Sequence, residues 1–99
     1  MSEGEVPRQG ERRPLSCEIE FRRRGDVAYR VDLIDLSPQG CRINPPIRVN
    51  PDEGVWLKIP GMEAIPARVA WAKEWDVGIE FERPFYPSVF DMVVQRLEG

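Results

Sequence analysis

The chain has 99 residues, which is the size of one domain, because an independent hydrophobic core needs on the order of 100 residues. It contains no histidine and two cysteines, which excludes histidine-dependent acid–base or nucleophilic catalysis and a four-ligand Cys/His zinc site. The formal net charge of −3 argues against a general binder of nucleic acid polymers or anionic membranes, since such binding depends on cationic neutralisation of phosphates.

The N-terminus gives no sign of a targeting segment. The sequence begins Met1-Ser2-Glu3, and no stretch approaches the roughly 20 apolar residues that a membrane span needs. We therefore expect a cytoplasmic protein without membrane insertion. In that compartment Cys17 and Cys41 would stay reduced and act as small buried residues, with a disulfide or redox pair as the alternative.

The first segment lacks any apolar period. Residues 1–14 contain two prolines, two glycines and several charged side chains, which predicts a flexible arm. The arginines of this arm are Arg8, Arg12 and Arg13.

A regular alternation of apolar and polar residues follows the arm, as is typical of strands with one buried face. Two such runs, residues 15–22 and 27–33, are joined by a short polar turn and predict a hairpin. The alternation then shifts at Ile34, as it does at a β-bulge, and this places Asp35 on the outer face.

The sequence Ser37-Pro38-Gln39-Gly40 predicts a turn in which proline presets φ and glycine supplies a positive φ. Four further short strands are expected over residues 41–43, 55–59, 65–71 and 77–81. Six short antiparallel strands in succession predict a closed barrel or a sandwich.

The last segment changes to a helical period. Its apolar residues fall at i, i+3, i+4 and i+7, at Phe90, Val93, Val94 and Leu97. Ser88 followed by Asp91 resembles a capping box, so we expect a helix over residues 88–98 that packs on the barrel.

Two motifs stand out from this framework, and neither resembles a catalytic centre. Arg8 and Arg12 form R-x-x-x-R before the first strand, and Asp35, Ser37 and Gly40 form D-x-S-x-x-G at the end of the second. With 12 arginines, chance alone gives about one R-x-x-x-R in such a chain. Chance gives only about 0.02 occurrences of D-x-S-x-x-G, so the second motif carries more weight.

In this order, the two motifs resemble the signature of the PilZ domain, a bacterial receptor for cyclic diguanylate (c-di-GMP). That signature is R-x-x-x-R before the first strand, then [D/N]-x-S-x-x-G about twenty-odd residues later. The segments Arg68–Trp71 and Val77–Phe81 are also similar to later strands of the family. The resemblance implies a mainly all-β fold over residues 15–99, a six-stranded antiparallel β-barrel with a C-terminal α-helix. Residues 1–14 would form a flexible N-terminal arm.

The resemblance also implies the ligand, c-di-GMP, and a binding site without a metal, a cofactor or catalytic residues. The ligand-binding residues would be Arg8, Arg12, Arg13, Asp35, Ser37 and Gly40. A guanidinium can pair with N7 and O6 of guanine or with a phosphodiester, and a carboxylate accepts from the N1–H and N2–H of guanine. Asp35 would thus read guanine, Ser37 would offer a hydroxyl, and Gly40 would allow close backbone approach. Arg13 replaces the apolar residue that often precedes the proline in this family.

These features predict a receptor or adaptor rather than an enzyme. The arm would wrap the ligand against the barrel face that carries Asp35 and Ser37. An unidentified effector protein in motility, biofilm or polysaccharide control would read the ordered arm. In this family the residue before the first arginine is associated with the number of stacked ligand molecules, and Pro7 favours one.

Plainer interpretations of the same residues are a solvated basic tail for the arginines and a capped polar turn for Asp35 and Ser37. The alternative function is a nucleotide-independent protein-interaction module of a pilus or motility system. A hydrolase acting on the same ligand is the weakest hypothesis, because the chain has no histidine and no evident metal set.

The tryptophans add one further candidate. Trp71 has the parity of Ile65 and Val69, which favours core packing, and stacking on a guanine at the barrel rim is the alternative. Trp56 is out of register with its neighbours and is expected on the outside, while Trp75 lies in a turn.

Overall fold

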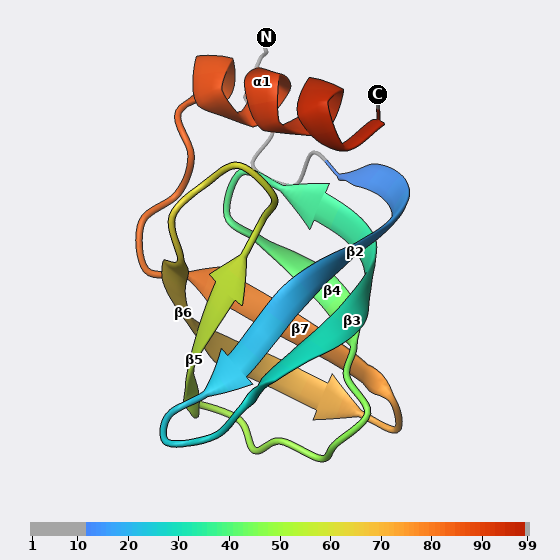
Figure 1. Cartoon of the computed structure of the whole chain (residues 1–99), viewed down its shortest axis with the longest axis vertical. Helices are drawn as coiled ribbons and strands as arrows, with labels where there is room; N and C mark the ends of the chain where they lie inside the picture. The colour runs from blue at the N-terminus through green and yellow to red at the C-terminus, as the bar shows by residue number, and fades with distance from the viewer. Residues whose placement is uncertain (1–11, 99) are drawn as a thin grey trace, which may run out of the picture.

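The computed structural model describes residues 12–98, which form a closed barrel with one helix across one end (Figure 1). The elements are β2 (Arg13–Arg23), β3 (Ala28–Ser37), β4 (Gly40–Asn44), β5 (Gly54–Lys58), β6 (Ile65–Lys73), β7 (Asp76–Phe81) and α1 (Pro87–Glu98). All strand pairs are antiparallel, in the order β2-β3-β4-β7-β6-β5, and β5 pairs with β2 to close the barrel. The predicted six-stranded barrel with a C-terminal helix is confirmed.

The alternating residues of the strands form the barrel interior. Their side chains are almost fully buried at Ile19, Phe21, Val31, Leu33, Leu36, Ile43, Val55, Leu57, Val69, Val77, Ile79 and Phe81. Burial of each large apolar side chain contributes about 1.5–3 kcal/mol, so this interior is the main source of stability. The polar residues that alternate with them face outward and supply the charged and hydrogen-bonding groups of the barrel surface.

The shift in alternation near the end of β3 is a β-bulge. The register of β3 against β4 changes between Leu33 and Asp35, and both Leu33 and Leu36 stay buried on either side of the change. The extra residue, Ile34, absorbs the change in parity. The bulge thereby turns Asp35 to the outer face of the barrel, as the sequence indicated.

The first strand begins earlier than the alternation indicated. Arg13 and Pro14 are expected at the end of the arm but belong to β2. They pair with Leu36 and Asp35, near the end of β3. Residues 1–11, which hold the rest of the expected arm, lie outside the described residues.

The turn between β3 and β4 differs from the prediction. Ser37 pairs with Gly40, which leaves Pro38 and Gln39 as a two-residue turn. Glycines with positive φ in the described chain are Gly25, at 74°, and Gly61, at 85°, so Gly40 does not supply a left-handed conformation. The expectation that Gly40 adopts a positive φ is therefore wrong. A glycine is needed at this position because a side chain would overlap the backbone of β7.

Helix α1 packs its apolar stripe on one end of the barrel, with Phe90, Val93 and Val94 buried. Its first hydrogen bond runs from the N–H of Phe90 to the carbonyl of Tyr86, at 2.9 Å. Tyr86 is thus the N-cap and Pro87 the first helical residue, where a missing N–H has no cost. The expected capping role of Ser88 is wrong, because the helix begins one residue earlier.

Two polar contacts fix the C-terminal half of α1. Arg96 donates from Nη1 to the carbonyl of Gly61 at 3.2 Å, and Nη2 of Arg13 lies 3.5 Å from Oε2 of Glu98. The second contact ties the last turn of the helix to the start of β2. Within residues 12–98, no helix is long and apolar enough to cross a membrane.

Candidate functional site

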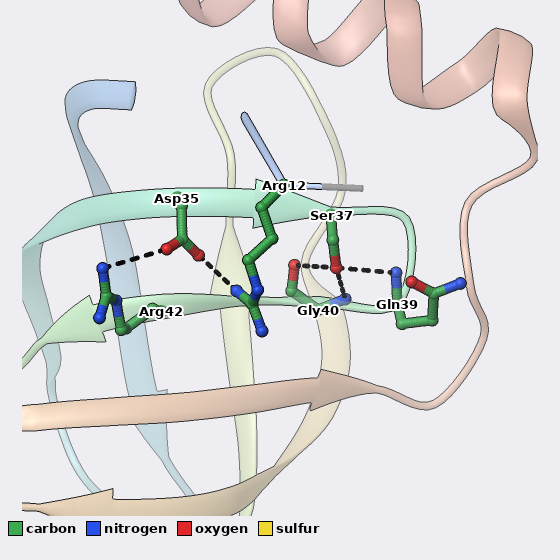
Figure 2. Close-up of polar contacts among 6 residues, drawn as sticks. All are labelled: Arg12, Asp35, Ser37, Gln39, Gly40 and Arg42. Atoms are coloured by element: carbon green, nitrogen blue, oxygen red, sulfur yellow. Dashed lines mark hydrogen bonds and ion pairs between the residues drawn. The ribbon is translucent and has the colours of Figure 1, made fainter. Parts of the chain in front are cut away.

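Asp35 lies on the outer face of β3, directly opposite Arg42 of β4. Directly opposed residues on paired antiparallel strands point to the same face. Oδ1 of Asp35 accepts from Nη1 of Arg12 at 2.6 Å, and Oδ2 lies 3.2 Å from Nη2 of Arg42 (Figure 2). Two guanidinium groups therefore cover one carboxylate, which explains why Asp35 is only 8% exposed although it faces outward.

Ser37 is buried and already saturated with backbone hydrogen bonds. Its Oγ accepts from the N–H of Gln39 at 3.3 Å and of Gly40 at 3.2 Å, and it donates to the carbonyl of Gly40 at 3.3 Å (Figure 2). These bonds hold the β3–β4 turn in shape. The turn-capping interpretation therefore accounts for the position of this serine.

An open hollow of about 300 Å³ lies over β4 and β7, next to the Arg12–Asp35 pair. Its floor includes Gly40 and Gly78, which have no side chains to fill it. A Cβ at Gly40 would overlap the backbone carbonyl of Ile79, so this glycine also permits the close approach of β4 and β7. The close approach at Gly40 is thus between two strands, and its role towards a ligand stays a prediction.

The rim of this hollow carries both signs of charge. Arg12 and Glu80 both line it, with side chains that are 54% and 49% exposed. Glu80 is itself 2.8 Å from Nη2 of Arg68 on β6. A cationic and an anionic group around one hollow suit a ligand that presents both an anion and a hydrogen-bond donor edge.

Trp71 also lines this hollow and is 40% exposed, so the core-packing interpretation is wrong. The reason is a second bulge, because the register of β6 against β7 shifts between Val69 and Trp71. The shift turns Trp71 outward, opposite Gly78, while Val69 stays inside. An aromatic face beside an arginine is thus available for stacking.

The other arginines of the motif are placed differently. Arg13 contacts Glu98 of α1 and does not line the hollow. Arg8 lies outside the described residues, as does Pro7. Of the predicted site residues, the structure therefore brings together Arg12, Asp35, Ser37, Gly40 and Trp71.

A second hollow, of about 430 Å³, lies over β2, β3 and β5 and is larger. Its lining includes Glu18, Glu20, Arg30 and Lys58 and none of the motif residues. The smaller hollow is the better candidate site, because Arg12, Ser37 and Gly40 of the two motifs line it.

The cysteines do not form a reactive centre. Both are free, and Cys41 is buried beside the site. Burial raises the pKa of the Cys41 thiol, the Asp35 carboxylate raises it further, and Arg12 opposes the rise. Burial also raises the pKa of the Cys17 thiol. Both thiols are thus protonated near neutral pH, and residues 12–98 hold no group of three side chains arranged as metal ligands.

Sequence reasoning missed two residues of the site, Arg42 and Glu80. A signal for Arg42 was present, because a two-residue turn that pairs Ser37 with Gly40 also brings Asp35 directly opposite residue 42, before the bulge is reached. Glu80 gave no comparable signal, since its approach to the hollow depends on the pairing of β4 with β7, in which Glu80 lies opposite Gly40, 40 positions earlier in the chain.

The described residues form a small β-barrel with an open, partly polar hollow on its surface. The sequence model of the PilZ domain family matches residues 7–87. The chain therefore belongs to this family of c-di-GMP receptor and adaptor modules. Among solved structures it is similar to the PilZ domain of CeSA from a cellulose synthesizing bacterium. The TM-score is 0.61 at 19% identity, over 90% of this chain and 95% of that one, which shows a shared fold. No curated protein sequence matched the chain.

Proposed function

We propose that this chain is a c-di-GMP receptor that binds its ligand in the hollow over β4 and β7. Arg8, Arg12 and Asp35 would make the principal polar contacts, Trp71 would stack on a guanine, and Gly40 would keep the floor open. Arg13 would add a contact only by leaving Glu98. Binding would order the part of the N-terminal arm that precedes β2 over the barrel.

The observation that carries this proposal is the ion pair of Arg12 with Asp35. These residues belong to different motifs and lie 23 positions apart, yet their side chains are in contact, and Arg12 also lines the hollow. Membership of the PilZ family supports the identity of the ligand. The two observations together favour a specific site over a chance clustering of charge.

The chemistry of c-di-GMP fits this arrangement. Its two phosphodiesters and the N7/O6 edges of its two guanines are acceptors for the planar guanidinium of Arg12. The N1–H and N2–H groups of guanine are donors for a carboxylate. Two charge-assisted arginine contacts, at about 1.5–3 kcal/mol each, can offset the ordering of a short arm and are compatible with micromolar affinity.

Ser37 would contribute mainly by holding the turn that borders the hollow. Its Oγ makes three hydrogen bonds within the turn, so a direct contact with the ligand would require one of them to exchange. Removal of this hydroxyl would therefore loosen the wall of the site as well as remove a polar group.

We infer that the ordered arm and the covered barrel surface signal to an effector protein in motility, biofilm or polysaccharide control. The signal would act in the cytoplasm, where the free thiols of Cys17 and Cys41 stay reduced. No chemical step is part of this function, and the ligand would leave the site unchanged.

The proposal is tested by isothermal titration of the full chain with c-di-GMP at tens of micromolar. The wild type should bind, and Arg12→Ala should bind at least about tenfold more weakly, the equivalent of about 1.4 kcal/mol. Arg30→Ala is the matched control, because Arg30 also pairs with a carboxylate, Glu18 at 3.4 Å, but lies away from the hollow. A wild type that binds no ligand, or Arg12→Ala with undiminished affinity, would disprove the proposal. Recovered ligand should be intact.

One observation favours a second function, that of a nucleotide-independent interaction module. Asp35 is already neutralised by two arginines and Ser37 is satisfied by its turn, so both motif residues have structural roles without a ligand. Under this hypothesis, a partner protein would be retained in a pull-down by the Arg8→Ala/Arg12→Ala variant in the absence of c-di-GMP. Loss of the partner on this double substitution would favour the receptor.

A further inference from the structure

We propose that Arg42 is a positioning residue that holds and neutralises Asp35 while Arg12 turns from Asp35 to the ligand. The ligand-dependent half of this inference rests on the proposed function. In the structure the two arginines share the carboxylate, one on each oxygen (Figure 2). In the bound chain Arg42 alone would keep the contact.

The two arginines differ in how firmly the chain holds them. Arg42 is in the middle of β4, with β3 on one side and β7 on the other, and it is paired in register with Asp35. Arg12 precedes the first residue of β2, and its side chain is 54% exposed against 38% for Arg42. Arg12 is thus the arginine that can move, and Arg42 is the one that stays.

The need for a second cation follows from the burial of Asp35. This residue is 8% exposed, and an ionised carboxylate shielded from water is strongly destabilised when it loses its only counter-charge. If Arg12 were the sole partner, its transfer to the ligand would leave such a carboxylate behind. Arg42 removes most of that cost, so Arg12 can exchange one anionic partner for another.

The contacts of Arg42 itself agree with this role. Its ion pair with Asp35 is the only polar contact of its side chain within residues 12–98, and its Nε is buried there without a hydrogen-bond partner. The surrounding strands therefore do little to satisfy this guanidinium. Its orientation is set by Asp35, and a guanidinium keeps its charge at any physiological pH.

A first experiment needs no ligand and measures melting temperatures. The variants are Arg12→Met, Arg42→Met and the double substitution, each with Asp35 and with Asp35→Asn. If the arginines share one carboxylate, the double variant should lose at least about 4 °C beyond the sum of the single losses. This excess should disappear with Asp35→Asn, which carries no charge. Additive losses with Asp35 present would overturn the inference.

A second experiment measures c-di-GMP affinity. Arg42→Met should weaken binding about tenfold, because Arg12 is then held by Asp35 and is less available to the ligand. Arg42→Lys keeps the charge and should restore affinity to within about threefold of wild type. Arg30→Met, on the outer face of β3, is the control and should bind like wild type.

The same titrations with Asp35→Asn separate positioning from direct contact. Asparagine keeps the shape and an acceptor oxygen, so the effect of Arg42→Met should vanish in this background. An undiminished effect would mean that Arg42 touches the ligand itself, and this would overturn the inference. If the wild type binds no c-di-GMP, the proposed function fails, and the melting temperatures alone decide whether Arg12 and Arg42 share Asp35.

Discussion

The indole of Trp71 on β6 occupies the space that a side chain would need at Gly78, its direct partner on β7. Because Gly78 has no side chain, the indole ring can lie on the outer face of the barrel and form one wall of the hollow. The pair therefore links the shape of the candidate site to a single missing Cβ.

Gly78→Ala should displace the indole rather than disrupt the sheet. The atoms that a new Cβ would meet belong to the Trp71 ring, which can rotate away, so we expect a modest loss of about 1 kcal/mol in denaturant unfolding. Gly54→Ala is the control, since a Cβ there meets nothing within 4 Å. In a Trp71→Ala background, the cost of Gly78→Ala should vanish, and a persistent cost would contradict the steric account.

Gly40→Ala should be much more destabilising. Here the new Cβ would overlap the backbone carbonyl of Ile79, which cannot move without separating β4 from β7. We expect a loss of at least about 3 kcal/mol, measured by denaturant unfolding against the same Gly54→Ala control. A Gly40→Ala variant as stable as Gly54→Ala would show that the two strands are not held this closely.

The barrel was predictable because alternation with a period of two directly reports which face of a strand is buried. The bulge in β3 was visible in the sequence, since two large apolar residues, Leu33 and Ile34, stand side by side. The bulge in β6 was not, because alanines at positions 70 and 72 fit either face and leave no break in the pattern. The orientation of Trp71 was therefore mispredicted.

Only those residues of the site that belong to a sequence motif could be predicted. Asp35, Ser37 and Gly40 are close in sequence, so one turn brings them together. The pairing of Arg13 with Glu98 joins the two ends of the described chain, and no local pattern indicates it. Contacts of this kind depend on the docking of α1, which is decided by packing over the whole barrel end.

The two cysteines should differ in reactivity towards a thiol reagent. Burial raises the pKa of both thiols, but Cys41 is 4% exposed whereas Cys17 is half-buried. At pH 8, one thiol per folded chain should react slowly and the second only on unfolding. Cys17→Ser should abolish the slow reaction, whereas Cys41→Ser should preserve it. Rapid labelling of two thiols in the folded chain would contradict the buried position of Cys41.

The ion pair of Glu53 with Arg23 should make stability depend on pH. Desolvation alone would raise the pKa of Glu53, but the Asn50 N–H and the Arg23 guanidinium outweigh it, and the pKa ends below its usual value. A lowered pKa stabilises the fold above the unfolded-state value, about 4.3, and this contribution is lost as pH falls through the folded-state value.

Glu53→Gln should therefore melt below wild type at pH 7, and the difference should shrink as the pH drops below about 4. Glu18→Gln is the control, because Glu18 is mainly exposed and its partner Arg30 lies 3.4 Å away. Melting temperatures at a series of pH values measure both. A difference for Glu53→Gln that is constant from neutral to acid pH would contradict the role of its ionised form.

Arg13→Ala should affect the helix more than the ligand. Arg13 and Arg12 are neighbours in sequence, yet Arg13 reaches Glu98 of α1 whereas Arg12 reaches Asp35 and the hollow. We expect Arg13→Ala to change c-di-GMP affinity by no more than about twofold, against about tenfold for Arg12→Ala. Faster amide hydrogen exchange in the last turn of α1 should accompany it, and Glu98→Gln should produce the same change. A loss of affinity equal to that of Arg12→Ala would place Arg13 among the ligand contacts instead.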